Sequence, residues 1–104
     1  MRIFVDIDGT LTRDGEQPWG EPQKDVMETV RSAIAAGHEV VIWSAQGAEY
    51  ADVFCHQYHL HPTACLGKPD IYVDDHEGIR PGKRMEWVKP AELAGYLAAN
   101  GWDR

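Results

Sequence analysis

Short apolar runs alternate with amphipathic segments along the chain. Residues 2–7 combine apolar, β-branched and aromatic side chains, a pattern typical of a β-strand. Residues 39–44 predict a second strand that is apolar enough to be buried on both faces. Three shorter runs, at residues 63–66, 70–74 and 85–88, predict further strands, the 70–74 strand buried and the last one at an edge.

The intervening segments predict helices. Pro22 suits the first position of a helix, and apolar residues recur at helical spacing from there until Gly37, a natural C-terminal stop. A second helix is expected from about Ala48, and a third from Pro90 to residues 100–101. Glycines and prolines make residues 9–21 a loop.

This alternation predicts an α/β fold, with a single domain over residues 1–104. The expected architecture is a three-layer, Rossmann-like parallel sheet with helices on both faces. Ligands of such sheets bind beyond the carboxyl ends of the strands. The polar side chains expected at that edge are Asp6, Asp8, Ser44, Lys68, Asp74 and Asp75.

Composition supports a globular chain and narrows its partners. The 104 residues are 43% hydrophobic and 26% charged, which is ordinary for one soluble domain. No membrane helix or signal peptide is expected. A disulfide between Cys55 and Cys65 is possible but not required, and the lack of a secretion signal favours a reducing cytoplasm. A net charge of -7 opposes binding to nucleic acid or anionic lipid, although it does not exclude a phosphorylated substrate.

The acidic residues predict a magnesium site. Carboxylates gathered in one small volume repel one another unless a cation compensates them. Mg²⁺ prefers oxygen ligands and is typically held by one or two carboxylates together with substrate phosphate. An aspartate can then attack phosphorus, while Lys68 and the Ser44 hydroxyl suit the transferring phosphoryl oxygens.

Four segments together resemble the motifs of the haloacid dehalogenase-like (HAD) superfamily. Asp6-Ile7-Asp8-Gly9-Thr10-Leu11 resembles the first motif, Ser44 at a strand end the second, Lys68 the third, and Asp74-Asp75 at another strand end the fourth. They occur in the family's order and cover residues 2 to about 80.

The resemblance implies a Mg²⁺-dependent phosphohydrolase that cleaves phosphomonoesters through an aspartyl-phosphate. Asp6 would be the nucleophile and a metal ligand, and Asp8 the general acid and base, with its backbone carbonyl also on the metal. Asp74 would bind the metal directly, with Asp75 sharing that role or acting through water. Ser44 and Lys68 would hold the phosphoryl oxygens. A carboxylate at position 8 fits ester hydrolysis, because an alkoxide leaving group must be protonated.

The chain resembles a member of the family without a cap domain. The loop at residues 9–21 and the stretch between Ser44 and Lys68 are too short to hold one. An open site suits a phosphorylated small molecule, a bulky phosphorylated substrate, or a homo-oligomer in which a neighbouring subunit acts as the lid.

Alternative interpretations concern both the function and individual residues. The chain could be a non-catalytic Mg²⁺- or phosphate-binding module, like a response-regulator receiver, but a receiver places its acidic pair first and its lysine last. His76 could touch a leaving group or fix a carboxylate, and Trp19 and Arg13 could contact substrate. The spacing of one further group matches no common zinc pattern. That group is Cys55, His56, His59, His61 and Cys65.

Overall fold

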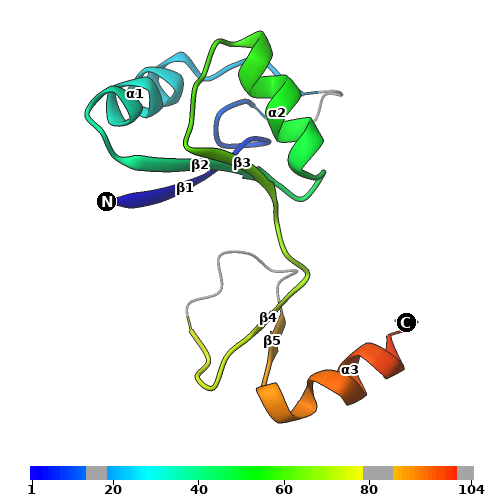
Figure 1. The fold of residues 1–104 in the computed structure, drawn as a ribbon. Helices are drawn as coiled ribbons and strands as arrows, with labels where there is room; N and C mark the ends of the chain where they lie inside the picture. The colour runs from blue at the N-terminus through cyan, green and yellow to red at the C-terminus, as the bar shows by residue number, and fades with distance from the viewer. Residues whose placement is uncertain (14–18, 79–85, 101–104) are drawn as a thin grey trace. The chain divides into compact units, whose positions relative to one another are not determined.

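The fold is a small α/β structure with parallel strands (Figure 1). The computed structural model describes residues 1–13, 19–78 and 86–100. The chain divides into two compact units, Met1–Lys68 and Pro69–Arg104. Each unit is described by itself, and a single catalytic domain over residues 1–104 stays a prediction.

The first unit is built on a parallel sheet of three strands in the order β1-β2-β3. These strands are β1 (Arg2–Asp6), β2 (Glu39–Ser44) and β3 (Ala64–Gly67). Five of the six residues of β2 are buried, as its apolar pattern predicts for a central strand. All three strands therefore bring their carboxyl ends to one edge of the sheet.

Helices α1 (Lys24–Ala35) and α2 (Ala48–Gln57) connect these strands and lie on the same face of the sheet (Figure 1). Two successive crossovers of the same hand that run in one direction across a sheet require this arrangement. The core lies between the helices and the sheet. Its buried members are Ile7, Leu11, Met27, Val30, Val40, Ile42, Ala51, Phe54, Cys55 and Leu60.

The opposite face of this sheet is also apolar. Side chains alternate across a strand, so residues that neighbour core positions point away from the helices. Phe4 and Leu66 on that face are 49% and 42% exposed, and the ring of Phe4 packs edge-on against Trp43.

The second unit contains strands β4 (Ile71–Val73) and β5 (Glu86–Val88), which pair in parallel as a separate sheet. A 3-10 turn, η1 (Pro90–Glu92), leads into helix α3 (Leu93–Ala99). Pro90 opens this turn because its fixed φ suits a first helical position and its missing N–H costs no hydrogen bond there.

The predicted strands and the first two helices match those observed to within about two residues, whereas α3 begins three residues after Pro90 because the 3-10 turn η1 precedes it. Met85 of the predicted last strand, residues 14–18 of the predicted loop and Gly101 lie outside the described residues. Two expectations differ: the strands form sheets of three and two strands instead of one, and β4 is only partly covered, with Val73 42% exposed. Among the described residues β4 pairs with β5 alone, and one neighbouring strand is too little to bury it. The three-layer arrangement stays a prediction.

The core predicts the effect of a paired substitution on α2. Phe54 is fully buried, whereas its neighbour Val53 is 51% exposed. Phe54→Ala should lower the free energy of unfolding by about 3–5 kcal/mol, because it removes apolar contacts and leaves a cavity. Val53→Ala should change it by less than about 0.5 kcal/mol. Urea unfolding followed by circular dichroism measures both, and equal losses would contradict this packing.

Candidate active site at the carboxyl edge of the first sheet

The Asp6 carboxylate lies at the end of β1 with a partner on each oxygen. Lys68 Nζ is 3.0 Å from Oδ1, and the Thr10 hydroxyl donates to Oδ2 at 3.2 Å. The side chains of Asp6 and Lys68 are 31% and 25% exposed, so the ion pair is partly shielded and still reachable from solvent. These two contacts fix the orientation of the carboxylate.

A tight turn after β1 holds this region in place. The carbonyl of Ile7 accepts hydrogen bonds from the backbone amides of Thr10, Leu11 and Thr12 at 2.9–3.1 Å. Gly9 has a φ of 85°, a conformation that side chains disfavour, and this lets the chain reverse within so few residues. The turn therefore fixes Asp6 and Asp8 relative to each other.

The turn is also tied to the start of α1. Gln23 donates its backbone N–H to the carbonyl of Leu11 at 2.8 Å. Its side-chain amide donates to the carbonyls of Thr10 and Thr12 at 3.0 and 3.4 Å. These bonds satisfy carbonyls that a tight turn would otherwise leave without partners.

Asp8 is half-buried and accepts a hydrogen bond from Tyr50 on α2. The phenol oxygen lies 2.7 Å from Oδ1 of Asp8. Desolvation by burial, and then the hydrogen bond to Asp8 and the negative charges of Asp8 and Asp6, raise the pKa of Tyr50 well above its usual range. The sequence placed Tyr50 on an apolar helix face, and this polar contact was missed because spacing alone does not show where a hydroxyl points.

Ser44 ends β2 at the same edge of the sheet. Its side chain is 1% exposed, and its Oγ accepts the backbone N–H of Gln46 at 3.0 Å. Helix α2 has Gly47 at its N-cap without a side-chain cap, so Ser44 orders the turn before the helix instead of capping it.

Lys68 follows β3 directly. Its backbone N–H donates to the carbonyl of Ser44 at 2.9 Å, and its Nζ lies 5.8 Å from the centre of the Trp43 ring. A side chain at Gly67 would come within 3.2 Å of the Gly47 backbone, so glycine lets the end of β3 approach the start of α2. The side chain of Lys68 thus lies beside the Asp6 carboxylate, and the backbone N–H of Lys68 bonds to the carbonyl of Ser44.

Asp74 and Asp75 follow β4 in the second unit. The Asp74 carboxylate accepts the backbone N–H of His76 at 3.0 Å, a bond that lowers the pKa of Asp74 below its usual value. The His76 ring lies 3.7 Å from the Asp75 carboxylate, and both side chains are exposed, so a role for His76 in fixing a carboxylate stays a prediction. The convergence of this acidic pair with Asp6 stays a prediction.

The oxygens of the first unit are of the kind that Mg²⁺ prefers. Asp6 and Asp8 are partly exposed carboxylates two residues apart on one turn, and Mg²⁺ is typically held by one or two carboxylates. No group of three or more His, Cys, Asp or Glu side chains suited to a metal was found across residues 1–13, 19–78 and 86–100. Asp6, Asp8, Asp74 and Asp75 as a joint ligand set therefore stay a prediction, and the pair in the first unit fits it chemically.

Trp19 packs onto α2. Its indole N–H donates to the Tyr58 hydroxyl at 3.3 Å, and its ring makes edge contacts with Tyr50, Phe54 and Tyr58. Trp19 therefore anchors the loop to the body of the first unit. Arg13 is exposed and pairs weakly with Glu21 at 4.0 Å.

The cysteines and histidines considered for zinc line a pocket of about 480 Å³ beside α2 and β3. Cys55 and Cys65 are both thiols, with their sulfur atoms 3.7 Å apart.

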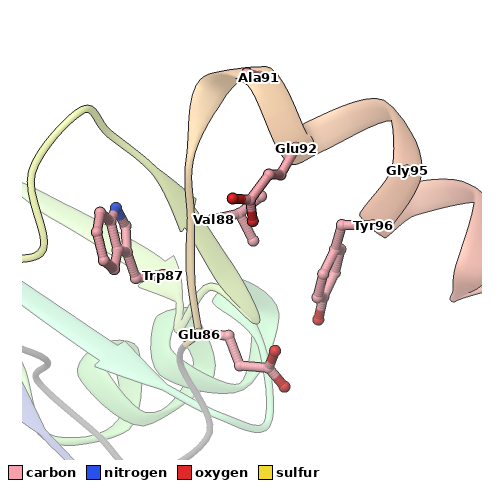
Figure 2. Close-up of a pocket in the computed structure, with 7 residues that line it drawn as sticks. All are labelled: Glu86, Trp87, Val88, Ala91, Glu92, Gly95 and Tyr96. Atoms are coloured by element: carbon pink, nitrogen blue, oxygen red, sulfur yellow. The ribbon is translucent and has the colours of Figure 1, made fainter.

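A pocket of about 430 Å³ lies in the second unit between β5 and α3 (Figure 2). Figure 2 shows the side chains of Glu86 and Tyr96 pointing toward each other there. Burial, followed by the negative charge of Glu86, raises the pKa of Tyr96.

Searches of protein-family models, curated proteins and solved structures found no match to this chain. None of the helices in the described part of the chain combines the length and hydrophobicity needed to cross a bilayer.

The two neighbouring thiols, Cys55 buried and Cys65 partly buried, predict slow alkylation in the folded state. Desolvation raises the pKa of both Cys55 and Cys65, and each unit of upward shift lowers the reactive thiolate fraction about tenfold at a given pH. Iodoacetamide at pH 8 should therefore modify the native protein at least about tenfold more slowly than the urea-unfolded chain.

The same shift fixes the sign of a pH effect on stability. Folded thiols keep their protons to higher pH than unfolded ones, so their stabilising effect is complete below the ordinary thiol pKa and declines as pH rises above it.

Mass spectrometry of timed samples measures the rate of alkylation by iodoacetamide. Equal rates in the native and the urea-unfolded protein would contradict the burial of the thiols.

Proposed function

We propose that this protein is a Mg²⁺-dependent phosphohydrolase that cleaves phosphomonoesters through an aspartyl-phosphate on Asp6. One observation carries the proposal: the Asp6 carboxylate lies at the carboxyl edge of a parallel sheet, 3.0 Å from Lys68. Asp8 follows two residues later on a rigid turn, and Ser44 ends the neighbouring strand. The resemblance of these residues to the first three HAD motifs agrees with that placement.

In the first step an Asp6 oxygen attacks phosphorus, and the bond between phosphorus and the ester oxygen breaks. The Lys68 ammonium is close enough to Asp6 to attract the phosphate and stabilise the negative charge on its oxygens. The Thr10 hydroxyl holds the other carboxylate oxygen, which limits rotation of the nucleophile.

Asp8 supplies the proton chemistry. As the ester bond breaks, Asp8 donates its proton to the leaving oxygen, which departs as an alcohol. In the second step Asp8 takes a proton from water as the water attacks the aspartyl-phosphate, and inorganic phosphate leaves. Each turnover therefore restores both carboxyl groups.

The magnesium ion would be held by the carboxylate of Asp6 and the backbone carbonyl of Asp8, with Asp74 and Asp75 from the second unit. When bound, it would offset the negative charge that the phosphate brings to an acidic site.

The wider proposal includes the fold, the substrate and the cellular setting. We place a helical layer on each face of the sheet, because Phe4 and Leu66 on the face opposite α1 and α2 are too exposed for a finished core. Between Ser44 and Lys68 the chain forms just α2 and β3, which supports a site without a cap. An open site suits a phosphorylated small molecule or a bulky phosphorylated substrate, or one covered by a second subunit. Because Cys55 and Cys65 are free thiols without a disulfide between them, we place the protein in the reducing environment of the cytoplasm.

Removal of the nucleophile tests the reaction class. With Mg²⁺, the wild-type protein should release phosphate from p-nitrophenyl phosphate, and EDTA should stop it. Asp6→Asn should reduce this release to background, because an amide is a poor nucleophile. Asp25→Asn, an exposed acidic position on α1, is the matched control and should keep wild-type activity. Activity of Asp6→Asn equal to wild type would refute the nucleophile assignment, and a Mg²⁺-binding wild type without turnover would favour the non-catalytic module.

Removal of the acid predicts a dependence on the leaving group. Asp8→Asn should slow the hydrolysis of phenyl phosphate by about 10²–10⁴-fold, because phenolate leaves poorly without a proton. The loss in the rate of ester cleavage should be smaller with p-nitrophenyl phosphate, whose leaving group needs less help. Rapid-quench measurement of phenol and nitrophenol release gives both rates, and equal losses would argue against the acid role.

A further inference from the structure

We propose that Tyr50 is a positioning residue for the general acid Asp8, holding Oδ1 so that Oδ2 carries the transferred proton. This inference rests on the proposed function, because it assigns a role within the same site. It concerns a residue on α2 that resembles no part of the four motifs.

The geometry is that of a strong hydrogen bond. The Tyr50 hydroxyl lies 2.7 Å from Oδ1 of Asp8, a favourable O–H···O distance that also falls within the range of charge-assisted bonds to a carboxylate. The phenol donates to Oδ1, which can accept this bond both in the ionised carboxylate and as the unprotonated oxygen of the carboxylic acid. Oδ1 is therefore engaged as an acceptor, and the proton is carried on Oδ2.

Positioning matters for a residue that must act twice. Asp8 donates a proton in the first step and accepts one in the second, and both transfers require its oxygen within hydrogen-bond reach of the reacting group. Asp8 lies on a turn, where its side chain could adopt several rotamers, and the bond to Tyr50 selects one of them.

Tyr50 is itself held by its neighbours on the first unit. The Trp19 ring packs edge-on against the Tyr50 ring, with centroids 5.7 Å apart. Trp19 in turn packs edge-on against Phe54, with ring centroids 5.2 Å apart. Aromatic contacts thus connect the loop, α2 and the acid, and they limit movement of the Tyr50 hydroxyl.

The experiment compares Tyr50→Phe with Tyr58→Phe. Both remove one hydroxyl from the same aromatic cluster, Tyr50 lying on α2 and Tyr58 directly after its last residue, and the Tyr58 hydroxyl bonds to Trp19 instead of Asp8. With Mg²⁺, Tyr50→Phe should lower the rapid-quench rate of phenol release from phenyl phosphate about tenfold to a hundredfold, with KM changed less than about twofold. The loss of nitrophenol release from p-nitrophenyl phosphate should be smaller. Tyr58→Phe should show neither effect, and circular dichroism confirms that each variant is folded.

A double substitution separates positioning from a structural role. In the Asp8→Asn background, Tyr50→Phe should cause little further loss of phenol release, since there is no acid left to position. A loss that multiplies with that of Asp8→Asn, or equal losses with the two esters, would overturn the inference.

A readout without turnover distinguishes failure of this inference from failure of the proposed function. In urea unfolding with EDTA, the shift in midpoint for the double variant should differ from the sum of the two single shifts, because the two side chains contact each other. Additive shifts would refute the hydrogen bond. Coupled shifts in a wild-type protein that hydrolyses neither ester would overturn the proposed function, and with it the catalytic role of Tyr50.

Discussion

The ion pair between Asp6 and Lys68 depends on the register of three parallel strands. Asp6 is aligned with Trp43 on β2, and Trp43 with Leu66 on β3, which places Lys68 two residues beyond that level. A slip of one residue would move a side chain to the other face of the sheet and separate the pair. The strand β2 prevents such a slip, because five of its six residues are buried and a slip would reverse the face to which each of them points.

Two carboxylates on one short turn have different partners, and this difference agrees with their proposed roles. Asp6 faces the Lys68 ammonium, whereas Asp8 faces the neutral hydroxyl of Tyr50. A cation beside Asp6 suits a group that must attack a negatively charged phosphate. A neutral donor beside Asp8 fixes the orientation of its carboxylate. The hydrogen bonds converging on the Ile7 carbonyl hold the turn on which Asp8 lies.

The apolar pattern was sufficient to predict the order and type of the elements. It also placed Asp6, Ser44 and Lys68 at one edge of a sheet, since the ends of parallel strands meet there. It could not predict which strands pair: β4 has an apolar pattern like that of β2, yet it pairs with β5 in a second sheet. Pairing depends on contacts between distant segments, which periodicity does not contain. Tyr50 was missed for a related reason, because a tyrosine in an apolar stripe contributes both a ring and a hydroxyl.

Covalent trapping tests the central claim most directly. Asp8→Asn protein, in which breakdown of the intermediate should be slow, is mixed with p-nitrophenyl phosphate and Mg²⁺, quenched in acid and reduced with borohydride. An aspartyl-phosphate is reduced to homoserine, so peptide mass spectrometry should find homoserine at position 6. Homoserine at another aspartate, or none while nitrophenol is released, would contradict the account.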